Sequence, residues 1–266
     1  MGIDTGRLSG AWNFRDVAES TGVRPGRFFR SSELTGLDDA GRGVIGRLGI
    51  TDVADLRSPR EVERRGPGRV PDGVAVHLLP FPDIAAVDGE APHEATFQKM
   101  MGEKPDDEDV AVAAKRFMVQ EYLHFPTLGG ARRAVREVVT LLADERPVIT
   151  HCFAGKDRTG FTVAVVLEAV GVDRDAIVAD FLRSNDAVPQ LRDQIMESVR
   201  SRAGETPEVV TFAEARLTDE VLGVREEYLD AARRTIEADY GSLGGFLHAA
   251  GVTDEQLGRL RGVLRG

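Results

Sequence analysis

Cysteine is nearly absent: Cys152 is the single cysteine among 266 residues. One cysteine cannot form an intramolecular disulfide, and it has no second thiol to resolve an oxidised intermediate, so a dithiol redox cycle is excluded. Histidine is also scarce, and none of the five has the spacing of metal ligands. They are His77, His93, His124, His151 and His248. We therefore predict a protein without a metal and without an organic cofactor.

Long apolar runs are missing as well. No run reaches the ~18 to 20 residues that a membrane span needs, and the first fourteen residues do not resemble a signal peptide. We therefore expect no integral membrane segment and a cytoplasmic chain, or one exported by a route that leaves no such mark. The sequence leaves the oligomeric state open.

Positive charge is in deficit, with 34 Lys and Arg against 44 Asp and Glu, a net charge of -10. This balance argues against general affinity for nucleic acid or for an anionic membrane surface. An anionic substrate must be attracted by a local basic site, and basic residues cluster at 57–69 and 156–158. The first cluster is alternatively a solvated helix face.

The chain is otherwise that of a soluble globular protein, with 42% hydrophobic residues. Short β-branched or apolar runs at 50–56, 74–79 and 147–150 predict buried strands. Apolar residues at helical spacing in 38–48 and 132–143 predict helices between them. The alternation indicates an α/β fold, a central, mainly parallel sheet flanked by helices, in one catalytic domain over 1–266.

The last third of the chain is predicted to be mostly helical. An almost wholly apolar helix at 159–170 follows the 147–150 strand. Further helices are predicted at 173–185, 190–202, 208–216, 219–240 and 253–264, separated by Pro189, Pro207 and the glycines of 241–245. Within this region, 186–240 is a candidate helical lid. A second candidate is the acidic insertion 83–116, whose alternative is a disordered surface loop.

A phosphate-binding loop is predicted between the 147–150 strand and the buried helix. It reads Cys152, Phe153, Ala154, Gly155, Lys156, Asp157, Arg158. A tight loop that enters a helix N-terminus offers backbone N–H groups and a positive dipole to a phosphate dianion. Gly155 lets the backbone curl close to the ligand. Arg158 can bind two phosphate oxygens bidentately, which lysine cannot reproduce.

The chemistry predicted for this loop is nucleophilic attack by Cys152. The positive field of the helix N-terminus and of nearby cations favours the thiolate, which is the reactive form. We expect His151 to face away from the phosphate and to fix the loop by hydrogen bonding. Thr159 can hydrogen-bond the sulfur and assist its departure. The alternative is that Cys152 is a small buried core residue in an ordinary strand-to-helix turn.

The run His-Cys-Phe-Ala-Gly-Lys-Asp-Arg-Thr-Gly resembles the signature of the cysteine-based protein tyrosine phosphatases. Four further segments, 12–16, 29–34, 55–58 and 80–83, make the chain similar to the bacterial tyrosine phosphatase family of the mycobacterial protein tyrosine phosphatase B type. The resemblance covers essentially the whole chain and is weakest at 83–109. It implies the cysteine phosphatase fold, with extra helices that form a lid.

The resemblance also implies broad activity on phosphotyrosine, phosphoserine, phosphothreonine and phosphoinositides. The implied partners are phosphorylated proteins or phosphoinositides, and family members are associated with secretion into a host cell and with virulence. Lys156 adds a second cation to the loop, and its place in the Cys-x-x-Gly-Lys-x-Arg pattern resembles phosphoinositide phosphatases. Lys156 is alternatively a solvated loop residue.

A proton donor to the leaving oxygen is required by this chemistry. The resemblance implies that Asp157 is this general acid, and Asp83, in a proline-flanked turn, is the alternative. Asp55 and Asp180 are predicted to be structural. Two other classes of function are weighed against a phosphatase: a catalytically silent phosphate-binding module, and sulfur transfer or arsenate reduction by the cysteine. The Cys152 and Arg158 pair favours the phosphatase, because binding alone needs no thiol and sulfur transfer needs no arginine clamp.

Overall fold

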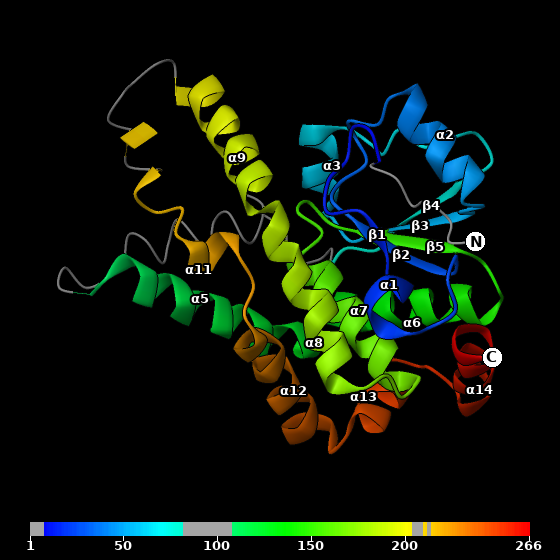
Figure 1. Ribbon diagram of the computed structural model, residues 1–266. Helices are drawn as coiled ribbons and strands as arrows, with labels where there is room; N and C mark the ends of the chain where they lie inside the picture. The colour runs from blue at the N-terminus through cyan, green and yellow to red at the C-terminus, as the bar shows by residue number, and fades with distance from the viewer. Residues whose placement is uncertain (1–7, 82–107, 204–209, 212–213) are drawn as a thin grey trace.

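A computed structural model of the chain describes residues 8–81, 108–203, 210–211 and 214–266. Its five-stranded sheet has the order β1-β2-β5-β3-β4 (Figure 1). β1 pairs with β2 antiparallel, and the other three pairs are parallel. The strands are β1 Arg15–Asp16, β2 Phe28–Ser31, β3 Asp52–Asp55, β4 Ala75–Leu78 and β5 Val148–His151. The predicted α/β fold with a mainly parallel sheet is confirmed.

Side chains of the inner strands alternate between two apolar cores on opposite faces of the sheet. Phe28, Ala54 and Val148 belong to the larger core, and their neighbours Phe29, Val53 and Ile149 belong to the smaller one. The smaller core also contains Ile45 of α2 (Asp39–Arg47). Because both faces are covered, these strands appear in the sequence as continuous apolar runs rather than alternating ones.

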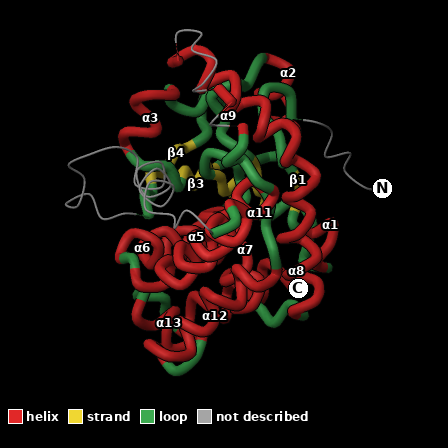
Figure 2. The backbone as a smooth tube through the Cα atoms, turned by 90° about the vertical axis from the view of Figure 1, so that its left-hand side faces the viewer, coloured by secondary structure: helices red, strands yellow, loops and turns green. Residues whose placement is uncertain are grey.

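Helices cover the larger core on the other face (Figure 2). They are α5 Val110–His124, α6 Gly129–Ala143, α7 Asp157–Ala169, α8 Arg174–Leu182, α12 Glu226–Tyr240, α13 Leu243–Ala249 and α14 Asp254–Arg265. The remaining described helices are α1 Ala18–Thr21, α3 Pro59–Arg65, α9 Val188–Ala203, α11 Asp219–Leu222 and the 3-10 turns η2 Phe125–Thr127 and η3 Arg183–Ala187. In the described part of the chain, no helix has the length and apolar character to cross a membrane.

Two predicted helix boundaries are wrong. Pro189 was expected to separate helices, yet it lies in the first turn of α9, where a missing N–H leaves no helical hydrogen bond unmade. The predicted helix 219–240 is two helices, because the chain breaks at Gly223 and Val224. There the side chain of Asn185 accepts from the Val224 N–H at 2.7 Å and donates to the Val224 carbonyl at 3.1 Å.

The predicted insertion 83–116 is described only in part. Residues 83–107, and Asp83 with them, lie outside the described residues. Asp109 caps α5 by accepting a hydrogen bond from the Ala111 N–H at 2.8 Å, so 110–116 form the first half of that helix. Ala113 and Ala114 are fully buried in it, and the C-terminal end of the segment is therefore part of the helical core. Of the predicted helix 208–216, four residues lie outside the description as well.

Candidate active site

The predicted phosphate-binding loop lies at the carboxyl end of the central strand. β5 ends at His151, Cys152 follows at 2% exposure, and α7 begins at Asp157. The strand lies between β2 and β3, so residues that follow those two strands surround the loop. In an open parallel sheet, this edge is where ligands bind.

The carbonyl groups of the loop are held outward by side chains from the first thirty residues. The Asn13 side-chain amide donates to the carbonyls of Ala154 and Gly155, each at 3.1 Å. Arg30 Nη2 donates to the Gly155 carbonyl at 2.8 Å. Because a trans peptide places its N–H opposite its C=O, the loop amides are turned toward the concave side of the loop. The loop therefore offers an anion several preorganised donors.

Gly155 allows this curl in two ways. Its φ of 66° favours glycine, and an added Cβ would lie 2.1 Å from the Ser31 carbonyl oxygen.

Gly155→Ala is expected to lower the affinity for inorganic phosphate more than tenfold, because the loop must move away from β2. Gly22→Ala is the matched control: Gly22 has φ 67° but no atom within 4 Å of an added Cβ. Equal phosphate affinities of the two variants by calorimetry would contradict this account.

Arg158 is held along one edge of its guanidinium. Nη1 and Nη2 each donate to a Glu61 carboxylate oxygen at 2.8 Å, and Nη1 also donates to the Leu56 carbonyl at 3.2 Å. Burial alone would lower the pKa of Arg158, but the Glu61 charge raises it above its ordinary value. These contacts use three of the five N–H groups. Nε–H and one Nη2–H remain on a single edge, which is the fork that a phosphate needs.

Glu61 is itself positioned by the start of α3. Ser58 and Glu61 form a capping box, in which Glu61 Oε2 accepts from the Ser58 N–H at 2.8 Å, with Pro59 in the first turn. Sequence reasoning did not identify Glu61 as a site residue. The Ser-Pro-x-Glu pattern signals a helix start, but it does not reveal which cation the glutamate contacts.

Asp157 and Lys156 form a polar cluster with Tyr122 of α5. The Tyr122 hydroxyl donates to Asp157 Oδ1 at 3.1 Å, and Lys156 Nζ lies 3.1 Å from Asp157 Oδ2. Lys156 Nζ also donates to the carbonyls of Val221 at 2.6 Å and Gly223 at 3.2 Å. Lys156 is 6% exposed, so it is not a solvated loop lysine.

His151 and Thr159 are both fully buried beside the nucleophile. His151 Nδ1 donates to the Cys152 carbonyl at 3.1 Å, which fits its predicted role in fixing the loop. Burial lowers the pKa of His151 although Asp55 acts in the opposite direction, so the ring is neutral near pH 7. Thr159 Oγ1 makes no hydrogen bond with any described residue, including Cys152, so its bond to the sulfur stays a prediction.

The two aspartates predicted to be structural both pair with buried arginines. Asp55 lies 2.7 Å from Arg57. Asp180 pairs with Arg15 at 2.8 Å and with Arg30 at 2.6 Å. Arg30 thus links Asp180 to the loop, a role that sequence reasoning missed. The sequence feature that could have identified Arg30 is its position as a charged residue inside the buried strand β2, because a buried charge requires a partner.

Apolar residues of α9 and of 214–222 cover the loop. With Ala154 they form a separate buried cluster, which also includes the partly buried Trp12 and Phe153. The members from the covering elements are Leu191, Met196, Leu217 and Leu222. Phe153 packs edge-on against Trp12, with ring centroids 6.4 Å apart, and Arg65 lies over the Phe153 ring at 4.3 Å.

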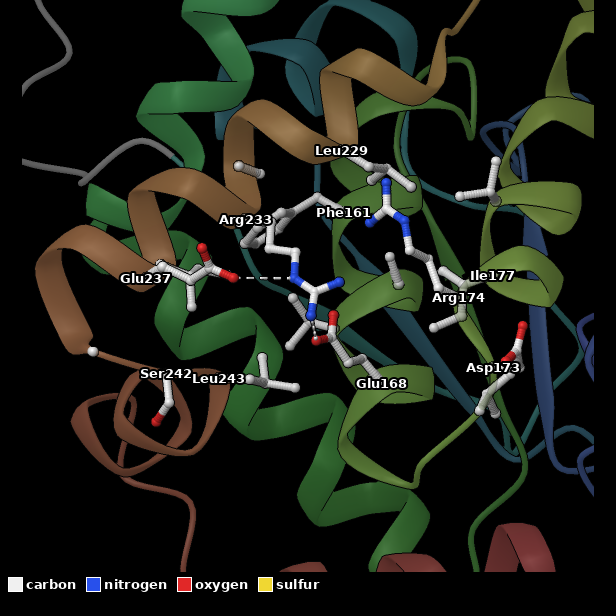
Figure 3. Close-up of a pocket in the computed structure, with 17 residues that line it drawn as sticks. Phe161, Glu168, Asp173, Arg174, Ile177, Leu229, Arg233, Glu237, Ser242 and Leu243 are labelled. Carbon is white, nitrogen blue, oxygen red and sulfur yellow. Dashed lines mark ion pairs between the residues drawn. The ribbon is translucent and has the colours of Figure 1, made fainter.

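A cavity of about 670 Å³ lies elsewhere, between α7, α8, α12 and α13 (Figure 3). Arg233 pairs there with Glu168 at 3.2 Å and with Glu237 at 3.4 Å. None of the residues that line it belongs to the loop 152–158. Across the described residues, no three His, Cys, Asp or Glu side chains are grouped as metal ligands. The prediction of metal-independent chemistry stays a prediction.

Known proteins similar to this chain are phosphatases. A "triple specificity protein phosphatase PtpB" from Mycobacterium tuberculosis is 62% identical over 271 residues, which cover 97% of this chain and 98% of that protein. A putative tyrosine-protein phosphatase from Cupriavidus necator is 30% identical, over 97% of this chain and 83% of its own length. A tyrosine-protein phosphatase from Nostoc commune is 23% identical, over 92% and 76%.

The match to a family extends over nearly the whole chain. The sequence profile described as "Tyrosine phosphatase family" matches residues 6–266. It therefore includes the β5 strand, the loop with Cys152 and Arg158, and the helices that cover them. The resemblance found in the sequence is confirmed, and the chain is a phosphatase that belongs to the tyrosine phosphatase family.

Proposed function

We propose that this phosphatase has broad specificity, hydrolysing phosphotyrosine, phosphoserine, phosphothreonine and phosphoinositides through a phosphocysteine intermediate on Cys152. The observation that carries the proposal is the loop itself. Asn13 and Arg30 bind the carbonyls of Ala154 and Gly155, which turns the peptide N–H groups toward the concave side of the loop, and Arg158 presents an unused fork of donors. The Mycobacterium tuberculosis relative is named a triple specificity protein phosphatase, and this name supports the proposal of broad substrate specificity.

The proposed reaction has two steps. In the first, the Cys152 thiolate attacks phosphorus, the bond from phosphorus to the ester oxygen breaks, and Asp157 gives its proton to that oxygen. In the second, water attacks the phosphocysteine, transfers a proton to Asp157 and releases inorganic phosphate with the thiolate restored. The loop amides and Arg158 stabilise the charge on the equatorial oxygens in both steps. Thr159 supports the departing sulfur.

Asp157 is proposed as the general acid because the family resemblance gives this role to the matching aspartate and because it lies in the first turn of α7, directly before Arg158. Asp83, the alternative, lies outside the described residues. If Asp83 supplies the proton, Asp157 orients Arg158 or the attacking water. His151 has no part in proton transfer in this scheme, because its ring faces the carbonyl of Cys152 and the Asp55 side of the sheet.

We propose in addition that 186–240 contains a lid, formed by α9 and 214–222. In support, these elements bury Ala154 under Leu191 and Leu222, and the backbone of 221–223 is bound to Lys156. A lipid head group or a phosphopeptide reaches Cys152 only when they move. Lys156 then exchanges backbone carbonyls for phosphate oxygens, which adds a second cation for polyphosphorylated head groups. A role for 83–116 as a further lid, and the secretion that the resemblance implies, stay predictions.

The proposal is tested by rapid-quench detection of a phosphoenzyme, with chelator present, using a phosphotyrosine peptide, a phosphoserine peptide and phosphatidylinositol phosphates. Wild type is expected to form phosphocysteine with all three, and Cys152→Ser with none. Asp157→Asn is expected to slow its formation about 10²-fold or more with phosphoserine but much less with phosphotyrosine, since a poorer leaving group depends more on protonation. Binding of the ligands without any phosphoenzyme would instead identify a phosphate-binding module.

A further inference from the structure

A tyrosine hydroxyl reaches the loop 152–158 from the buried face of α5. Ala114, Met118 and Tyr122 follow one another at four-residue spacing, which places them on one face of the helix, and all three are buried. A fully buried tyrosine needs a hydrogen-bond partner for its hydroxyl. Here the hydroxyl donates to Asp157 Oδ1 at 3.1 Å, and it makes no other hydrogen bond with a described residue. The single O–H of Tyr122 is therefore committed to the carboxyl proposed as the general acid.

The ring of Tyr122 is held in place by other aromatic side chains. Its centroid lies 4.9 Å from that of Phe125, 5.5 Å from that of Tyr228 and 6.1 Å from that of Phe181. Close packing of this kind restricts the side chain to one rotamer, and the hydroxyl oxygen lies on the ring axis, so ring flips do not move it. Burial raises the pKa of Tyr122, and the charge of Asp157 adds to the rise, so the hydroxyl stays protonated at neutral pH. Tyr122 is thus a preorganised donor.

The two oxygens of the Asp157 carboxyl have different surroundings. Tyr122 contacts Oδ1, whereas Lys156 Nζ lies 3.2 Å from Oδ1 and 3.1 Å from Oδ2. In the lid movement proposed above, Lys156 turns to the substrate phosphate, and Tyr122 is then the remaining hydrogen-bond partner of this carboxyl among the described residues. A carboxylic acid carries its proton on one oxygen and accepts with the other. Because the Tyr122 O–H has Oδ1 as its acceptor, the acid proton of Asp157 lies on Oδ2.

We propose that Tyr122 is the positioning residue of the general acid: its hydrogen bond to Oδ1 of Asp157 fixes the acid proton on Oδ2 and directs it to the ester oxygen. The inference rests on the proposed function, because it requires Asp157 to protonate the leaving group. When Oδ2–H gives its proton to the ester oxygen, Asp157 becomes a carboxylate, and Oδ1 accepts from Tyr122 both before and after the transfer. The same bond leaves Oδ2 free to take the proton of the attacking water in the second step. Tyr122 acts through Asp157 and transfers no proton itself.

The consequence of this role is a dependence of the rate on the leaving group. Without the Tyr122 hydroxyl, the Asp157 carboxyl can turn, and protonation of the leaving oxygen lags behind bond breaking. Phenoxide, a poor leaving group, then slows the reaction more than 4-nitrophenoxide, which needs little protonation. A loss of packing or of phosphate binding would instead slow both substrates equally. The leaving-group ratio, which is kcat/KM for 4-nitrophenyl phosphate divided by kcat/KM for phenyl phosphate, therefore isolates proton donation.

The test measures the leaving-group ratio in wild type, Tyr122→Phe, Asp157→Asn and the double variant. Phenylalanine keeps the ring contacts and removes only the hydroxyl. Tyr122→Phe is expected to raise the ratio about threefold to fivefold, and Asp157→Asn about tenfold or more. The double variant should have the ratio of Asp157→Asn alone, because no acid proton is left to position. The control Tyr240→Phe, which removes a hydroxyl that donates to the Pro126 carbonyl at 3.0 Å, should keep the wild-type ratio and kcat/KM.

Three results would overturn the inference and leave the proposed function standing. If Asp157→Asn raises the ratio and Tyr122→Phe does not, the bond between them has no part in proton transfer. If Tyr122→Phe lowers kcat/KM for both substrates by the same factor, the hydroxyl supports only the structure of the loop. If Tyr122→Phe still raises the ratio in the Asp157→Asn background, it acts through another group. An unchanged ratio in Asp157→Asn instead contradicts Asp157 as the general acid, and the inference fails with that part of the proposed function.

Discussion

Arg158→Lys is expected to lower kcat/KM for a phosphotyrosine peptide about 10²–10³-fold in a chain that still folds. The reason is the division of the guanidinium between two tasks. One edge is bound to both carboxylate oxygens of Glu61, and the opposite edge is left for phosphate. A lysine ammonium carries its three donors on one atom, so it cannot hold Glu61 and two phosphate oxygens in one plane. Steady-state kinetics measure kcat/KM, and far-UV circular dichroism shows whether the variant still folds.

Two companion variants sharpen this test. Glu61→Gln keeps acceptor and donor atoms at the start of α3 but removes the charge that fixes Arg158, so its kcat/KM should fall in the same direction and by less. Arg47→Lys, at an exposed position on α2, is the matched control and should leave kcat/KM unchanged. A value for Arg158→Lys within threefold of wild type would refute the assignment of the free edge to phosphate.

The sequence was informative about the loop because the features that define it are local. Strand, Cys152, tight turn and buried helix follow one another within about twenty residues, and each has its own signature in residue type or spacing. The burial of the strand was expected from its short run of apolar and β-branched residues. The prediction of the nucleophile and of Arg158 therefore needed no tertiary information.

The supports of the loop were not predictable in this way. Glu61 meets Arg158 across 97 residues, and Asn13 reaches the Gly155 carbonyl across 142. Such contacts depend on which strands become neighbours, and a single sequence does not specify strand order. The break between α11 and α12 has the same origin, because the side chain of Asn185 satisfies the backbone at Val224 and replaces the helical hydrogen bonds there.

Asp180→Asn is expected to lower the free energy of unfolding by about 3–5 kcal/mol, because it leaves two buried guanidinium groups without their shared counter-charge. Asp180 is 1% exposed, and Arg30, one of its two partners, is fully buried. Burial would raise the pKa of Asp180, but Arg30 and Arg15 together lower it below its ordinary value. The carboxylate therefore stabilises the fold above its ordinary pKa, and that stabilisation is lost as the pH falls through the lowered value.

Urea denaturation at pH 7 measures this loss of stability. The control Asp186→Asn, at an exposed aspartate of η3, should have a free energy of unfolding within about 0.5 kcal/mol of wild type.

Asp180→Asn should also affect the active site. Arg30 donates to the Gly155 carbonyl, and Arg15 donates to Asn13, whose amide binds the same carbonyl. When Asp180 no longer fixes the two arginines, the loop amides lose their common orientation. Phosphate affinity should therefore fall in Asp180→Asn even at temperatures where the variant is fully folded, and an unchanged affinity would show that Asp180 supports the fold alone.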